Sequence, residues 1–167
     1  MMMHAYDESY LRYTMKNVAV MMYYGINVYG LSPNDFYDMF LESGVAEKIS
    51  DGNPRYLCGL SGAELAELVI KKDEDDGKDL GFTGYYETTP EYWAGWALSY
   101  YQWYSCKSFG DIKWSGLTFD KVIAMYYPLH EADLTKFVEV VELLLNTDTP
   151  PTKVAEEFEG YTGINLH

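Results

Sequence analysis

The chain has 167 residues, of which 48% are hydrophobic and 17% aromatic, and its formal net charge is −14 at pH 7. This length and apolar content predict one domain with a sizeable buried core and exclude an intrinsically disordered chain. The acidic balance argues against direct binding to nucleic acid, because that requires lysine and arginine to neutralise phosphates. The same charge is compatible with a basic protein partner, with nucleic-acid mimicry or simply with solubility.

The first half of the chain carries the signals of several amphipathic helices. Apolar residues recur at three- and four-residue steps between positions 7 and 29, which predicts a first helix with Arg12 and Lys16 off its apolar stripe. Ser32, followed by a proline, is typical of a helix start, because serine accepts an orphan amide proton and proline has none to leave unpaired. We expect a short helix over residues 45–50 after the one that starts there.

A capping-box pattern and an acidic run come next. Ser61 and Glu64 are three residues apart, as in helices whose first side chains exchange hydrogen bonds with backbone amides, so we expect a helix to start there. The acidic run comprises Asp73, Glu74, Asp75, Asp76 and Asp79. It is only superficially similar to a calcium-binding loop, whose twelfth position needs a glutamate where this chain has Gly84. We interpret the run as a solvated loop, followed by irregular structure with a short strand pair that includes Tyr85 and Tyr86.

Residues 89–106 give the helix around which we expect the fold to be organised. Thr89 occupies the cap position and Pro90 the first helical position. Seven aromatic side chains lie within the sixteen residues that start at Thr89, and they fall on every side of a 3.6-residue helix. This distribution predicts a helix packed nearly all round. The small residues Ala94 and Gly95 would let a neighbouring backbone approach closely.

The rest of the chain predicts further helices and a tail. We expect a short helix first, then a helix that Thr118 caps and Pro128 ends, and then a last helix over residues 131–146. Residues 147–167 are interpreted as a linker and a short C-terminal tail. The predicted fold is therefore all-α, a single compact multi-helix domain over residues 1–146 around the central aromatic helix.

Signals for a membrane segment, a metal site or a known catalytic motif are missing from the sequence. Cys58 and Cys106 follow no metal-ligand spacing, so we expect reduced, buried thiols in a cytoplasmic protein. No secretory signal is recognisable, and no apolar run is long enough to cross a bilayer. His4, His130 and His167 form no ligand cluster, and no hydrolase or nucleotide-binding motif appears. We expect no metal, no cofactor and no enzyme activity.

An aromatic pocket is the alternative that the residues leave open. Trp93, Trp96 and Trp103 would line it, although core packing explains these tryptophans as well. Arg55, Gln102 and His130 are the polar residues that would turn such a pocket into a ligand-binding or catalytic site. For Arg55 we favour a structural ion pair with a carboxylate, and for His130 a role at a helix boundary.

Several segments together resemble a family of small proteins, without an assigned activity, from gut Firmicutes and Actinobacteria. They are residues 4–7, 10–11, 35–40, 43–47, 52–56, 59–62, 64–66, 90–96, 100–104, 107–109 and 127–132. The resemblance implies a helical domain that is often fused to a helix-turn-helix unit and encoded beside ADP-ribosyltransferase-like genes. That setting is similar to a toxin–antitoxin module. Since the residues after the predicted domain are too few for a helix-turn-helix unit, we expect no direct operator binding.

The function that we expect is protein binding. An acidic, tyrosine-rich surface would neutralise a partner protein, either as an antitoxin-like module or as a mobile-element inhibitor that mimics nucleic acid. The expected contacts are Asp73, Glu74, Asp75, Asp76 and Asp79, which would steer a basic partner, with Tyr85 and Tyr86 supplying contact area. The alternative is a small enzyme or ligand-binding domain with the aromatic pocket.

Overall fold

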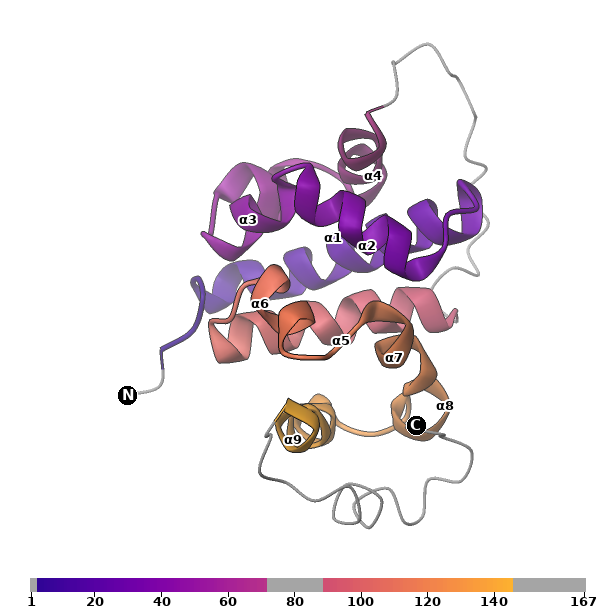
Figure 1. Ribbon diagram of the computed structural model, residues 1–167. Helices are drawn as coiled ribbons and strands as arrows, with labels where there is room; N and C mark the ends of the chain where they lie inside the picture. Colours follow the sequence, from indigo (N-terminus) through magenta and orange to yellow (C-terminus); the bar gives the residue numbers. More distant parts are fainter. Residues whose placement is uncertain (1–2, 72–88, 146–167) are drawn as a thin grey trace.

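The computed structural model describes residues 3–71 and 89–145, and the ordered elements in these two ranges are all helical (Figure 1). The predicted all-α fold is therefore confirmed. No helix within these ranges has the length and apolar character that a bilayer crossing requires.

The first described range folds into four α-helices connected by short turns. They are α1 (Leu11–Tyr23), α2 (Pro33–Glu42), α3 (Val45–Ser50) and α4 (Gly62–Ile70). A 3-10 turn (Glu8–Tyr10) precedes α1, one π-helical turn (Tyr24–Val28) follows it, and another (Arg55–Gly59) precedes α4. The predicted first helix is thus continuous in direction but changes its hydrogen-bond pattern at both ends.

The second described range begins with the predicted central helix. Its elements are α5 (Pro90–Ser105), α6 (Phe109–Trp114), α7 (Phe119–Ala124), α8 (Tyr126–Leu129) and α9 (Leu134–Leu145). The acidic run and the predicted strand pair at Tyr85 and Tyr86 fall outside the described residues, as does the C-terminal tail.

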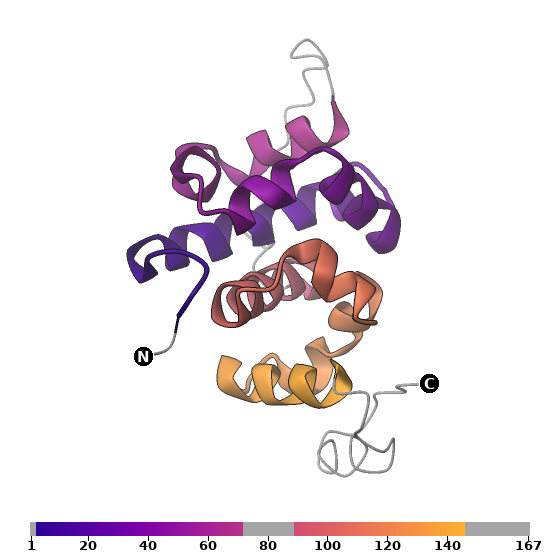
Figure 2. The same cartoon turned by 60° about the vertical axis from the view of Figure 1, so that its left-hand side comes forward.

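Helix α5 lies in the middle of the molecule, with α1 to α4 on one side and α8 and α9 on the other (Figures 1 and 2). It runs antiparallel to α1. The amide of Ala5 donates to the carbonyl of Trp103 near one end of the pair, and Asn27 donates to Glu91 near the other. Aromatic side chains of α5 itself lie on all its sides, and most of its side chains are buried, as the sequence predicted.

The close approach of α1 and α5 depends on a small residue. A Cβ atom added to Gly95 would lie 2.9 Å from the Cα atom of Ala19 and 3.0 Å from the carbonyl oxygen of Val18. Real Cβ atoms hardly ever come so close to backbone, so only glycine allows the observed spacing. The expectation that small residues in this helix let another backbone approach is confirmed at this position.

Side-chain caps start three helices where the sequence predicted them. Ser32 accepts a hydrogen bond from the Asp35 amide at the start of α2. Thr89 accepts one from the Tyr92 amide at the start of α5. At the start of α4, Ser61 and Glu64 form the complete capping box. These helix starts were predictable because each depends only on residues within one turn.

Three local predictions were wrong in whole or in part. Thr118 does occupy the cap position of α7, but its hydroxyl bonds to the Asp120 carboxylate and not to a backbone amide. Pro128 lies inside the short helix α8, where the first turn needs no amide proton from it. Cys58 and Cys106 are free thiols as expected, but both are exposed.

Candidate functional site

An acidic groove of about 600 Å³ lies between α2, α3 and α6. The described residues that line it are Asp38, Leu41, Glu42, Ala46, Glu47, Ser50, Asp51, Ser108, Phe109, Gly110, Lys113 and Trp114. Four carboxylates thus face a single lysine in the groove. This excess of acids gives the groove a negative local potential, in the same sense as the charge of the whole chain.

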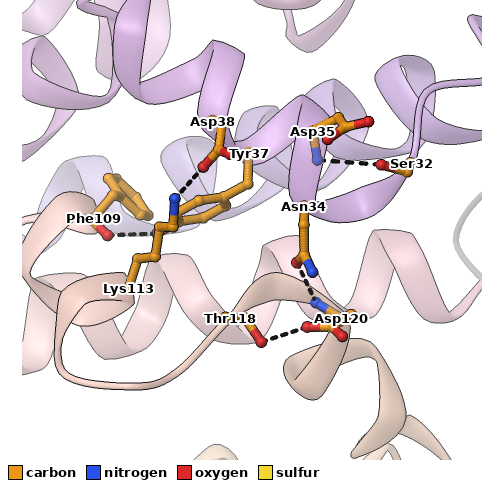
Figure 3. A network of polar contacts seen from close by, with 9 residues as sticks. All are labelled: Ser32, Asn34, Asp35, Tyr37, Asp38, Phe109, Lys113, Thr118 and Asp120. Atoms are coloured by element: carbon orange, nitrogen blue, oxygen red, sulfur yellow. Dashed lines mark hydrogen bonds and ion pairs between the residues drawn. The ribbon is translucent and has the colours of Figure 1, made fainter.

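Two contacts hold α6 against α2 and so set the width of the groove (Figure 3). The Tyr37 hydroxyl donates a 2.6 Å hydrogen bond to the carbonyl of Phe109, and the Lys113 ammonium pairs with the Asp38 carboxylate. The Tyr37 ring is almost completely buried, and burial raises the pKa of its hydroxyl above the usual value. The phenol therefore stays protonated and serves as a permanent hydrogen-bond donor between the two helices.

A further contact in the same network holds α7 against α2. The side-chain oxygen of Asn34 accepts a 3.2 Å hydrogen bond from the Asp120 amide (Figure 3). Burial by itself would raise the pKa of the Asp120 carboxyl, but hydrogen bonds with Thr118, Asn34 and Lys121 hold it below its usual value. Helix α2 is therefore held by polar contacts to α7 as well as to α6.

Trp114 ends α6 at the rim of the groove, where 78% of its surface is exposed. The Lys113 ammonium lies 5.0 Å from the centre of its ring, which is within the range of a cation–π contact. A tryptophan left this open on a folded protein is unusual, because burying its ring is strongly favourable. The indole thus offers a large apolar contact surface directly beside the carboxylates.

The three carboxylates other than Asp38 have no ion-pair partner among the described residues. Glu42, Glu47 and Asp51 are exposed, and none of them lies within ion-pair distance of a described lysine, arginine or histidine. Since Lys113 neutralises only Asp38, the other three carboxylates are available to a basic group from outside.

A second cleft, of about 630 Å³, lies between α1 and α5. The described residues that line it are Arg12, Tyr13, Lys16, Tyr92, Trp93 and Trp96. Two of the residues predicted for an aromatic pocket, Trp93 and Trp96, therefore do line a cleft.

The other predicted pocket residues lie elsewhere. Trp103 is buried, and its indole N–H donates a 2.8 Å hydrogen bond to the carbonyl of Tyr6. Gln102 is fully buried and donates to the carbonyl of Lys107. Arg55 begins the π-helical turn before α4, is exposed, and forms no ion pair with a described carboxylate. The structure therefore does not bring Arg55, Gln102 and His130 together beside the tryptophans.

His130 occupies the boundary position that the sequence favoured. It is the C-cap of α8, its backbone amide donates to the carbonyl of Tyr126, and its Nδ1 atom lies 2.8 Å from that same oxygen. Its ring stacks on the Tyr126 ring with centroids 4.4 Å apart. These contacts account for the histidine as a structural residue at the end of a helix.

The residues predicted to contact a partner lie outside the described ranges. These are Asp73, Glu74, Asp75, Asp76 and Asp79, with Tyr85 and Tyr86. Their role stays a prediction, as does the expected absence of a cofactor. Within residues 3–71 and 89–145, no group of three or more His, Cys, Asp or Glu side chains is placed to hold a metal ion.

Sequence reasoning missed Trp114 at the groove and the two cations of the cleft. Trp114 is in a six-residue helix whose pattern does not say which side faces solvent. Arg12 and Lys16 were placed off the apolar stripe, and their four-residue spacing on one helix face was the available signal. The sequence does not show which other helix Trp114 faces, or which helix the pair of Arg12 and Lys16 faces.

Comparison of the chain with models of protein families, with curated proteins and with solved structures found no match. The resemblance to the family from gut bacteria accordingly stays a prediction.

Proposed function

We propose that this protein binds a basic partner protein through its acidic surface and thereby blocks the partner's own binding or active site. The observation that carries the proposal is the exposed Trp114 ring at the rim of a groove that holds Glu42, Glu47 and Asp51. An antitoxin-like or inhibitory role would suit such a surface, and the family resemblance points the same way. A partner that acts on nucleic acid would present the complementary basic surface.

In the proposed complex, the carboxylates and the tryptophan have different roles. Carboxylates at the edge of an interface mainly speed the encounter with a basic surface, whereas carboxylates that become paired and buried in the complex also hold the partner. A tryptophan that becomes fully buried on binding supplies most of the affinity, because a few aromatic or arginine anchors dominate protein interfaces. The groove places both kinds of group side by side, whereas the acidic run at Asp73 to Asp79 would add long-range steering.

The experiment is capture of a partner by the tagged full-length chain from a lysate of the native host, at low and at high salt. We expect one stoichiometric protein that is retained at low salt and lost at high salt, because salt screens exposed charges. The groove variant Glu42→Gln, Glu47→Gln, Asp51→Asn should lose this protein even at low salt. Capture that is equally strong with the groove variant would overturn the role of the groove.

A matched control separates the groove from the overall charge. Glu8→Gln, Asp35→Asn and Glu67→Gln remove the same three charges from exposed residues that do not line the groove. Since the net charge changes equally in both triple variants, the control variant should still capture the partner. Loss of capture in both would show that total charge, and not this groove, governs binding.

A second variant tests the acidic run on the same partner. Changing Asp73, Glu74, Asp75, Asp76 and Asp79 to the corresponding amides should slow association without unfolding the domain. An unchanged association rate would exclude steering by these five residues.

A further inference from the structure

The cleft between α1 and α5 has a composition that the proposed protein-binding role does not explain. Its described lining combines two cations, Arg12 and Lys16, with the aromatic residues Tyr13, Tyr92, Trp93 and Trp96. No carboxylate is among these six residues. In a chain with 26 acidic and 12 basic residues, two cations without an acidic neighbour in the same cleft are unexpected.

Neither cation of the cleft has a partner within the two described ranges, so both can bind an external group. Arg12 and Lys16 are exposed and lie four residues apart, which places them on the same face of α1. Neither side chain forms a hydrogen bond, an ion pair or a cation–π contact with a described residue. A guanidinium and an ammonium one helical turn apart are well suited to share one anionic group, with arginine able to bind it through two parallel hydrogen bonds.

The aromatic wall opposite the cations is rigid. The Tyr92 and Trp96 rings are stacked on α5, with centroids 6.4 Å apart and planes 19° apart. The Trp93 ring is 91% buried and is fixed by edge-to-face contacts with Phe137 at 5.5 Å and Tyr126 at 6.0 Å. Ordered rings of this kind lose little conformational entropy when another ring stacks on them.

Tyr13 completes the cleft on the side of α1. Its ring is 62% exposed, although it lies between Arg12 and the buried Thr14. An exposed phenol beside two cations gives the cleft a second aromatic surface on the wall that carries the charge. The volume of about 630 Å³ lies within the range of about 300–1,000 Å³ typical of small-molecule sites.

We infer that this cleft binds a small planar aromatic anion. Its ring would stack on the aromatic lining of α5, and its phosphate or carboxylate group would pair with Arg12 and Lys16. A nucleoside monophosphate and an indole or benzene carboxylate share this chemistry. The inference does not depend on the acidic groove, which lies between other helices.

The experiment is isothermal titration of the full-length chain at low salt with two probes, adenosine monophosphate and indole-3-carboxylate. At least one probe should bind with a dissociation constant in the millimolar range or below. Adenosine has the ring without the anionic group, and inorganic phosphate has the anionic group without the ring. Each should bind at least about 10-fold more weakly than adenosine monophosphate. Binding by only one of the two probes identifies whether the cleft takes nucleotides or aromatic acids.

Variants assign the binding to the cleft. Arg12→Gln with Lys16→Gln should weaken the bound probe about 10-fold or more, because both charge-assisted contacts are lost. The matched control, Arg55→Gln with Lys71→Gln, removes one arginine and one lysine that are exposed and lie outside the cleft. The control should bind as the wild type does, and thermal unfolding should show that all variants stay folded.

Three results would overturn the inference. They are the absence of heat with both probes at millimolar concentration, equal binding of inorganic phosphate and adenosine monophosphate, and equal weakening by the cleft and control variants. The second would reveal a simple phosphate site without a role for the rings, and the third would reveal a general charge effect.

Discussion

The groove between α2, α3 and α6 and the cleft between α1 and α5 are similar in volume but opposite in local charge. Among residues 3–71 and 89–145, Glu42, Glu47 and Asp51 have no ion-pair partner in the groove, and Arg12 and Lys16 have none in the cleft. The net charge of −14 therefore agrees in sign with the groove but not with the cleft. The comparison teaches that the total charge of a chain predicts long-range attraction, whereas local chemistry is set by which helices meet.

The two regions also differ in how they are built. The groove is walled by short helices that side-chain contacts hold together, such as the hydrogen bond from Tyr37 to Phe109. The cleft lies between the two longest helices of the described ranges, which pack backbone against backbone at Gly95. We expect the cleft walls to be the more rigid of the two, because close backbone packing leaves less room for adjustment.

The largest expected effect comes from disrupting the close packing of α1 against α5, the two helices that form the cleft. Gly95→Leu would force a side chain into the backbone of α1 at Ala19 and should lower the free energy of unfolding by about 3 kcal/mol or more. The gain in helix propensity, about 0.8 kcal/mol, offsets only part of this loss. Urea unfolding followed by circular dichroism measures the change.

Gly110→Ala in α6, which lines the groove, shows the effect of adding a Cβ atom to a helical glycine that has room for it. A Cβ atom there would make only ordinary contacts, the nearest at 3.8 Å from the Ser108 hydroxyl. The free energy of unfolding should therefore stay the same or rise slightly. If Gly95→Leu were as harmless as Gly110→Ala, the close approach of α1 and α5 would not be what stabilises the domain.

An effect of intermediate size should separate the two regions by function. Trp114→Ala should weaken the complex with the captured partner by about 2 kcal/mol, roughly 30-fold, because the indole is the apolar anchor of the groove. Stability and aromatic-anion binding in the cleft should not change, since the ring is 78% exposed and lies outside the cleft. Surface plasmon resonance with the purified partner measures the affinity.

Tyr127→Ala removes another aromatic ring of similar exposure, 76%, which lines neither cavity. Partner affinity should be unaffected by this change. An equal loss in both variants would mean that exposed aromatic surface in general, and not Trp114 in the groove, drives the interaction.

The effect that is smallest near neutral pH is a loss of stability at high pH through two buried phenols, Tyr6 and Tyr37. Burial raises the pKa of Tyr6 to about 12, and burial, with Asp38 nearby, raises the pKa of Tyr37 further. Because the folded state holds these protons more tightly than the unfolded state, stability is complete below pH 10 and falls as the pH rises beyond it. Each phenol contributes a slope of about 1.4 kcal/mol per pH unit there.

Thermal unfolding between pH 8 and pH 12 measures this slope. Tyr37→Phe should reduce it, whereas Tyr127→Phe, which changes an exposed phenol, should leave it as in the wild type. A slope that is identical in all three proteins would contradict the assignment to Tyr37.

Local sequence signals were enough to predict the all-α class and many of the helix starts. Ser32, Ser61 and Thr89 cap helices through side chains that reach only three residues along the chain. Such contacts form in the same way whatever the rest of the molecule does. The central position of α5 was likewise predictable, because a helix that is aromatic on all sides has to be covered on all sides.

Features that depend on a distant segment were not predictable. Pro128 was expected to end a helix and instead lies within the first turn of α8, and the cysteines expected in the core are exposed. Periodicity states which residues share a helix face, but not which other helix that face meets. The same pattern therefore fits a buried face and an open one.

The sequence by itself determined the helices, the acidic charge and the small residues at which helices touch. The tertiary structure alone decided that Trp114 stands open beside Glu42 and Glu47, and that Arg12 and Lys16 face Trp96. The physical reason is one of range. Capping and propensity act within a few residues, whereas a groove or a cleft is formed by side chains that only the packing of helices far apart in the chain brings together.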